Sequence, residues 1–306
     1  MSVYLPTIKQ LQYLVALHET GHFGRAANAC FVTQSTLSAG LREMESLLGV
    51  TLVERTKRVV RFTILGDKIV AKARHVLREA EELADLVAAS GEPLSGDLRM
   101  SVIPTIAPFM LPAILPKLRA QWPKLRLFLR EETSGAACVN LHRGQVDCVL
   151  LALPYAYGEV DCAPLFSDKL CVAFPPGERL PKRATPQNLD EKRLLLLEDG
   201  HCLKDHVLAA CNRPELRAEA MMLGTSLHTL VQMVDNGLGV TMLPEMAVNS
   251  GILAGTGITT CPLEADHATR EIALVWRKAS PRSADFRLLA EVLQTAVPPD
   301  SDLPVQ

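Results

Sequence analysis

Hydrophobic positions in the first fifty residues repeat with helical spacing. The spacing predicts a helix that ends near Thr20 and Gly21, with an inner face of Ile8, Leu11, Leu14, Val15 and His18. A short helix over residues 25–30 is expected next, and Phe31 and Val32 make a tight connection. Thr33 is the expected N-cap of a third helix, whose apolar residues recur at helical spacing: Leu37, Leu41, Met44 and Leu48. The pattern therefore predicts three packed helices.

The outward face of the third helix is small, polar and basic. It carries Gln34, Ser35, Ser38, Ala39 and Arg42. Two helices joined by a short turn, with such side chains on the second, have the dimensions of a helix-turn-helix whose second helix fits the DNA major groove. A hairpin is expected next, with strands over residues 51–55 and 59–63. Four basic residues lie on this hairpin: Arg55, Lys57, Arg58 and Arg61. They could contact DNA phosphates or the minor groove, and the alternative is that they only form a solvated basic surface.

Residues 69–87 favour a long helix with one apolar seam. The seam residues are spaced by four and three in alternation: Ile69, Ala73, Val76, Ala80, Leu83 and Val87. Such a seam suits a partner helix, and a dimer would supply the twofold symmetry of a palindromic DNA site. The alternative is packing against the chain's own domain. We expect a winged helix-turn-helix DNA-binding domain over 1–65, a dimerisation helix over 66–90, a hinge over 91–97 and a regulatory domain over 98–306.

The second half of the chain alternates strands and helices. Strands are expected over residues 98–103, 125–129, 148–151, 170–174, 240–243 and 271–276. Helices are expected over residues 109–121, 136–143, 226–236 and 284–295. This alternation predicts an α/β fold in which a mostly parallel sheet carries helices on both faces.

The segment from Leu194 to Cys211 carries the candidate chemistry. Four leucines read as a buried strand, and Cys202 then falls at the start of a helix with the apolar stripe Leu203, Val207 and Leu208. Unpaired N–H groups and the helix dipole stabilise a thiolate, and His201 and Lys204 add positive charge. We therefore expect a depressed pKa and a reactive thiol at Cys202.

A second cysteine, Cys211, lies nine residues further on. In a regular helix it would be on the opposite face and roughly 13 Å along the axis, whereas a disulfide needs α-carbons within about 7 Å. Bonding of the two would require the helix to unwind, as in a redox switch. Two alternatives stay open: buried structural cysteines, and a metal site formed by His201, Cys202, His206 and Cys211.

Charge and length add further limits. The 306 residues carry a net charge of −2, but residues 25–74 hold nine Lys or Arg against four Asp or Glu, which is a local basic patch. The N-terminus shows no leader pattern and no stretch is long and apolar enough to span a bilayer, so we expect a cytoplasmic protein without membrane association. There the eight cysteines would be mostly free and any disulfide transient. No cofactor is expected.

Residues 7–66, with the segments AAxxCFVTQSTLS and LGVTLVERTKRVVRFTILG, resemble the winged helix-turn-helix of LysR-type transcriptional regulators. The resemblance covers nearly the whole chain. It implies an effector half of two Rossmann-like subdomains, similar to periplasmic binding proteins, over about 98–164 with 268–300 and over 165–267. Two departures are visible: Ser35 stands where proline is frequent, and Ala39-Gly40 stands where glutamine or arginine is common.

Within the effector half, IPTIAPFMLPAILPKL, EDGHCLKD and WRKASP resemble the peroxide-sensing members of that family. By this resemblance Cys202 is the peroxidatic cysteine and Cys211 the resolving one. The resemblance also implies a peroxide pocket formed by Thr105, Ser134, His201, Asp205 and Arg277. Ser134 stands where threonine is usual, and His206 stands where glutamine is frequent.

The resemblance implies a regulator that hydrogen peroxide switches through a Cys202–Cys211 disulfide, a stoichiometric reaction and not enzymatic turnover. Its expected partners are double-stranded DNA, RNA polymerase, a thiol reductant and further copies of the chain, as a homodimer through the long helix and a homotetramer. Two other functions stay open. One is a LysR-type regulator with a small anionic co-inducer in the effector cleft, and the other is a thiol peroxidase.

Overall fold

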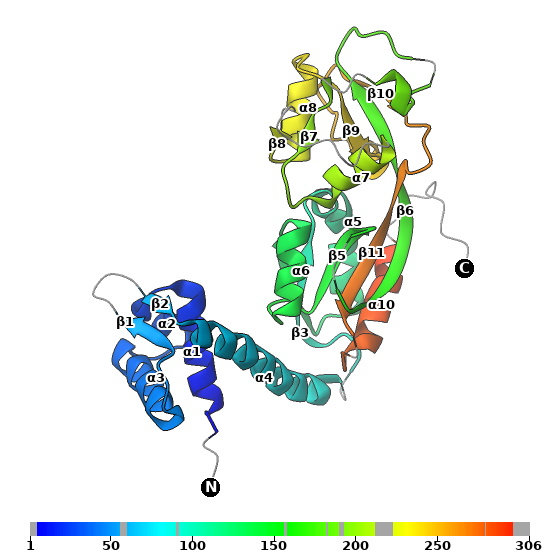
Figure 1. Cartoon of the computed structure of the whole chain (residues 1–306). Coiled ribbons are helices and arrows are strands. Elements are labelled where there is room, and N and C mark those ends of the chain that lie inside the picture. The colour runs from blue at the N-terminus through cyan, green and yellow to red at the C-terminus, as the bar shows by residue number, and fades with distance from the viewer. Residues whose placement is uncertain are drawn as a thin grey trace. The chain divides into compact units, whose positions relative to one another are not determined.

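The computed structural model describes residues 5–55, 60–89, 92–155, 158–181, 183–189, 193–211, 223–278 and 280–295. The chain forms two compact units, Met1–Val87 and Ala88–Gln306 (Figure 1). Within the described residues, no helix has the length and apolar character that crossing a membrane requires.

The first unit contains the predicted helix-turn-helix and wing. Its elements are α1 (Ile8–Thr20), α2 (Phe23–Ala29), α3 (Gln34–Leu48), the antiparallel strands β1 (Val53–Arg55) and β2 (Val60–Phe62), and the start of α4 (Ile64–Ala89). Gly21 ends α1 in the left-handed conformation, and Thr33 caps α3 by accepting a hydrogen bond from the Thr36 N–H. The core includes the predicted residues Leu14, Leu37, Leu41 and Met44.

Gly40 has a packing role at the contact between α1 and α3. A Cβ atom at this position would lie 3.1 Å from the ring of Tyr13, closer than ordinary contact distance. A glycine inside a helix costs about 1 kcal/mol relative to alanine. The close approach of Tyr13 explains why the chain tolerates this cost.

The seam of α4 is divided between two environments. Val70 and Ala73 are buried in the core of the first unit, whereas Val76 and Leu83 are 44% and 67% exposed. The expectation that a partner helix covers the whole seam from Ile69 to Val87 is therefore wrong for its first turns. There the apolar side chains pack against the chain's own domain. Apolar side chains are exposed at the start of α4, at Ile64 and Leu65, and again in its later part, at Val76 and Leu83.

The second unit is built on a seven-stranded sheet in the order β10-β6-β11-β5-β3-β4, with β9 pairing with β6. The strands are β3 (Gly96–Val102), β4 (Leu125–Glu131), β5 (Cys148–Leu153), β6 (Val160–Phe174), β9 (Thr241–Pro244), β10 (Thr259–Pro262) and β11 (Thr269–Arg277). Only β3 pairs in parallel, with β4 and β5, whereas the other described pairings of this sheet are antiparallel. The predicted mostly parallel sheet is therefore wrong, because the long strands β6 and β11 run antiparallel to their neighbours.

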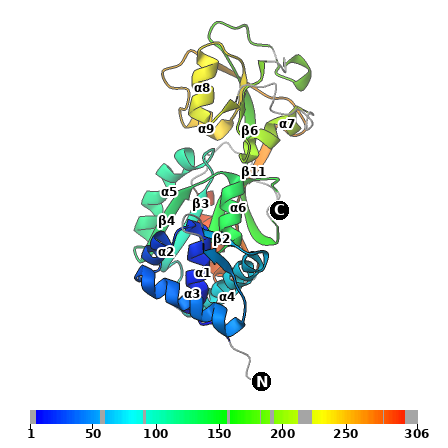
Figure 2. The same cartoon turned by 60° about the vertical axis from the view of Figure 1, so that its left-hand side comes forward.

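Two apolar cores divide this unit into subdomains that β6 and β11 join (Figure 1). The first contains α5 (Ala107–Gln121), α6 (Ser134–His142) and α10 (Ser283–Gln294), and Figure 2 shows α5 and α6 on either side of β3. The second contains α7 (Cys202–Ala210), α8 (Leu227–Asp235), α9 (Glu245–Asn249), the short 3-10 helix Pro186–Asn188 and the parallel strands β7 (Leu196–Leu197) and β8 (Leu223–Gly224).

Candidate functional site

Cys202 lies where the two subdomains meet. It is the first residue of α7, His201 is the N-cap, and the Cys202 side chain is only 1% exposed. Cys202 packs in the core of the first subdomain, whereas Leu203 and Val207 of the same helix pack in the core of the second. The hydroxyl oxygen of Ser134, at the start of α6, accepts a 3.3 Å hydrogen bond from the Cys202 backbone N–H. The structure thus brings together Ser134 and Cys202, two residues of the pocket that the family resemblance implies.

Arg270 supplies the cation of this region. It is 1% exposed, and its Nη1 donates a 2.8 Å hydrogen bond to the Thr105 hydroxyl while its Nη2 donates to the Thr105 carbonyl at 3.0 Å. Asp168, on the neighbouring strand, pairs with the same guanidinium at 2.9 Å and also accepts the Met246 N–H at the start of α9. This buried ion pair connects β6, β11, the loop after β3 and α9. The positive charge of Arg270 lowers the pKa of Cys202.

Arg277, predicted for the peroxide pocket, does not join this cluster. Its Nη1 donates hydrogen bonds to the carbonyls of Leu141 and Val146, at 3.1 and 2.8 Å. Both arginines lie on β11, and Arg270 is the one that contacts Thr105. The structure therefore does not bring Arg277 together with Thr105, and Arg270 is the arginine that contacts Thr105. The sequence alone gave no signal that separates the two arginines, because the burial of Arg270 and its pairing with Asp168 follow from the tertiary fold.

The pKa of Cys202 differs from the sequence expectation. Burial raises the pKa of this thiol, and it outweighs the hydrogen bond from Ser134, the charge of Arg270 and the backbone hydrogen bond from Ala152, which all lower the pKa. Burial also lowers the pKa of His201, which favours its neutral form. Lys204 pairs with Asp199 at 2.5 Å. His201 and Lys204 therefore do not supply the positive charge that was expected to lower the pKa of Cys202. The charge of Arg270 acts on the thiol instead.

Asp205 lies in the first turn of α7 and is exposed. Burial is the main cause that raises the pKa of Cys202 and that of Tyr155, which follows β5, and the charge of Asp205 raises both slightly further. Burial raises the pKa of Asp205 itself, whereas Lys204 lowers it. Asp205 is therefore near the thiol, but its charge opposes thiolate formation.

His206 shares the Cys202 face of α7 and is 4% exposed. Its Nε2 lies 3.0 Å from the Pro154 carbonyl oxygen, so this nitrogen carries the proton and donates. Its Nδ1 is buried without a hydrogen-bond partner in the described part of the chain. Burial lowers the pKa of His206 to about 4, which keeps the ring neutral at pH 7.

Cys211 caps the C-terminal end of α7 and packs in the core of the second subdomain. Burial raises the pKa of Cys211 to about 11. Cys202 and Cys211 are free thiols, and their side chains pack in the cores of different subdomains. This agrees with the opposite faces of one helix that the sequence spacing predicts. The predicted metal alternative finds no support, since the described residues contain no cluster of three His, Cys, Asp or Glu that could hold a metal ion.

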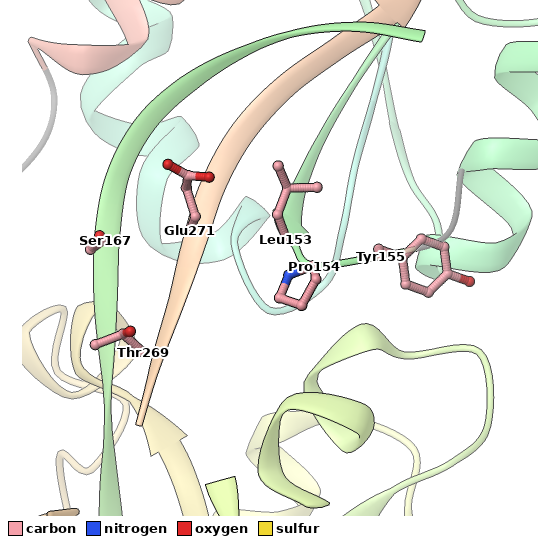
Figure 3. A pocket seen from close by; sticks show the side chains of 6 residues that line it. All are labelled: Leu153, Pro154, Tyr155, Ser167, Thr269 and Glu271. Atoms are coloured by element: carbon pink, nitrogen blue, oxygen red, sulfur yellow. The ribbon is translucent and has the colours of Figure 1, made fainter. Parts of the chain in front are cut away.

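A separate pocket of about 390 Å³ lies beside this region (Figure 3). One wall is Leu153, Pro154 and Tyr155 at the end of β5, and the other is the polar set Ser167, Thr269 and Glu271 on β6 and β11. In the strand register Glu271 lies between Leu153 and Ser167. A carboxylate with two hydroxyls suits a ligand that donates hydrogen bonds and disfavours the anionic ligand that the sequence suggested.

Several predicted DNA-binding side chains lie on the surface of the first unit. Gln34, Ser35 and Arg42 are exposed on α3, and Ser38 is half-buried. Arg61 is exposed on β2, where it lies opposite Glu54. Arg55 ends β1, and Lys57 and Arg58 lie outside the described residues.

Comparison with known proteins agrees with both units. Residues 8–67 match the bacterial regulatory helix-turn-helix protein family, lysR family, and residues 91–298 match the LysR substrate binding domain. The chain is 41% identical to the HTH-type transcriptional regulator EstR of Acinetobacter baylyi, covering 95% of this chain and 97% of the relative. It is 38% identical to a hydrogen peroxide-inducible genes activator of Dickeya chrysanthemi, covering 93% of each.

Among solved structures, a variant of full-length OxyR from Pseudomonas aeruginosa matches with a TM-score of 0.77 and 34% identity over 99% of each chain. Both family models and full-length relatives thus agree with the helix-turn-helix unit and the two-subdomain effector unit. The chain belongs to the LysR family of transcriptional regulators.

Proposed function

We propose that this LysR-family regulator senses hydrogen peroxide through Cys202. One observation carries the proposal: a buried thiol at a helix N-terminus faces the hydroxyl of Ser134, the N–H of Ala152 and the charge of Arg270. Similarity to regulators named for hydrogen peroxide supports the same chemistry.

The arrangement suits attack of sulfur on a peroxide. The departing oxygen gains negative charge, which hydrogen-bond donors and a nearby cation stabilise. Thr105 accepts a hydrogen bond from Arg270, and Ser134 accepts one from the Cys202 N–H, so each hydroxyl keeps its own proton to donate. His201 is neutral and lies at the N-cap, while Asp205 lies in the first turn beside the site.

Oxidation then switches the fold around α7. Cys202 becomes a sulfenic acid, which condenses with Cys211 to form a disulfide and release water. Because the two side chains pack in different cores, α7 must unwind for the sulfurs to meet. A cellular thiol reductant restores the first state. The reaction is stoichiometric, so the chain acts as a sensor and not as a thiol peroxidase.

DNA recognition belongs to the first unit in this proposal. Gln34, Ser35, Ser38 and Arg42 of α3 read the major groove, and the basic wing with Arg55, Lys57, Arg58 and Arg61 contacts the backbone. The exposed Val76 and Leu83 of α4 pair two copies of the chain, and two dimers form a tetramer on DNA. The rearranged regulator alters its contact with RNA polymerase.

The experiment is a transcription assay with Cys202→Ser. We expect this variant to bind the wild-type operator but to lose the peroxide response completely. A variant that keeps full induction by peroxide refutes the proposal. Cys162→Ser is the matched control, because Cys162 is exposed on β6.

A second candidate function is regulation by a small organic effector. It is favoured by the pocket that Pro154 and Glu271 line. Thermal unfolding with a panel of small alcohols, amines and carboxylates tests it. Stabilisation by one compound, lost in Glu271→Gln and absent with peroxide, would favour this function over peroxide sensing.

A further inference from the structure

The buried groups that the structure places around Cys202 are mainly hydrogen-bond donors, because the nearby carboxylate of Asp205 is exposed. Thr105 and Ser134 present hydroxyl protons, and the Ala152 N–H bonds the thiol. Hydrogen peroxide carries two O–H groups of its own, and a buried O–H without an acceptor costs about 1 to 3 kcal/mol. The site therefore needs a buried acceptor for at least one peroxide proton.

His206 holds such an acceptor. Because Nε2 donates to the Pro154 carbonyl, Nδ1 carries a lone pair, and this atom has no hydrogen-bond partner among the described residues. The low pKa of the ring keeps that lone pair available at neutral pH. The family resemblance does not supply this group, since similar regulators often carry glutamine here.

The backbone places His206 beside the thiol. Cys202 and His206 are one turn apart on the same face of α7, and helical side chains lean toward the N-terminus, so the imidazole leans toward the turn that carries Cys202. Both side chains lie by the end of β5, since the backbone of Ala152 lowers the pKa of Cys202 and His206 donates to the Pro154 carbonyl. The charge of Arg270 acts on both.

We propose that Nδ1 of His206 accepts a hydrogen bond from hydrogen peroxide bound at Cys202 and so orients the oxidant. The inference rests on the proposed peroxide sensing. In the reaction an S–O bond forms and the O–O bond breaks; sulfur is oxidised and peroxide is reduced. The thiol proton joins the departing hydroxide as water, and His206 ends in its starting protonation state.

Two substitutions separate the ring nitrogens. Asn places its amide near the position of Nδ1, and Gln places its amide near the position of Nε2. His206→Asn therefore keeps the acceptor and loses the bond to Pro154, whereas His206→Gln keeps that bond and loses the acceptor. If His206 has only a structural role, the Gln variant should react with peroxide faster than the Asn variant. If His206 accepts a hydrogen bond from the substrate, the Asn variant should react faster.

The test measures the second-order rate of Cys202 oxidation by hydrogen peroxide and, separately, of its alkylation by iodoacetamide, in the full chain. We expect His206→Asn to react with peroxide within about twofold of wild type and His206→Gln about fivefold slower, the effect of one hydrogen bond. Alkylation should stay unchanged in both. A Gln variant at the wild-type peroxide rate, or alkylation that falls in proportion, overturns the inference. A wild-type Cys202 inert to peroxide would instead refute the proposed function itself.

Discussion

The buried pair Arg270–Asp168 yields the sharpest stability prediction. Both side chains are at most 3% exposed, and Asp168 is the only carboxylate paired with this guanidinium among the described residues. Asp168→Asn keeps the shape but leaves a buried charge without its counter-ion. Removing one partner of such a pair typically costs about 3 to 5 kcal/mol, a large part of the 5 to 15 kcal/mol that usually stabilises a domain.

Urea unfolding followed by tryptophan fluorescence measures this loss. Trp122 and Trp276 are the two tryptophans of the chain, and both lie in the second unit, so the signal reports that unit. The double variant Asp168→Leu with Arg270→Met removes both charges and should be more stable than Asp168→Asn alone. The double variant should nevertheless react slowly with peroxide, because the cation is gone. A loss below about 0.5 kcal/mol in Asp168→Asn would refute the assigned role of the pair.

Three further predictions concern pH and DNA. The pKa of His206 is lowered to about 4, so its contribution to stability is present above the unfolded pKa of about 6.5 and is lost as pH falls toward 4. In chemical denaturation, the free energy of unfolding of wild type should therefore fall by about 2 to 3 kcal/mol more than that of His206→Gln between pH 7 and pH 4.5. Burial raises the pKa of Cys202, so its alkylation rate should keep rising above pH 9, and a plateau below pH 7 would show a depressed pKa instead. Arg42→Ala should reduce the dependence of log affinity for DNA on log salt by about one phosphate contact, whereas an unchanged slope in a filter-binding titration would remove Arg42 from the interface.

The periodicity of the sequence predicted most of the helices, because each one has a clear apolar stripe. The cap at Thr33, the inward Leu37, Leu41 and Met44, and the start of α7 at Cys202 all agree with the structure. The strand direction was not predictable in this way. The register of β6 and β11 depends on pairing between residues about one hundred positions apart, such as Asp168 and Arg270.

The same long-range pairing explains the errors at the site. Arg270 and Arg277 lie on the same strand, and only the tertiary fold decides which guanidinium contacts Thr105. The pKa of Cys202 was misjudged because a helix N-terminus and basic neighbours are visible in the sequence, whereas burial to 1% exposure is not. His206 was visible as an unusual residue, but its unpartnered Nδ1 follows from the position of Pro154.

Peptide mapping after oxidation tests peroxide sensing most directly. Trypsin cleaves after Arg193 and Lys204, which places Cys202 and Cys211 in separate peptides. After treatment with one equivalent of hydrogen peroxide, mass spectrometry should detect these two peptides joined by a disulfide that dithiothreitol releases, with the other cysteines still free. Recovery of both peptides as free thiols, or Cys202 oxidised while Cys211 stays free, would contradict the account.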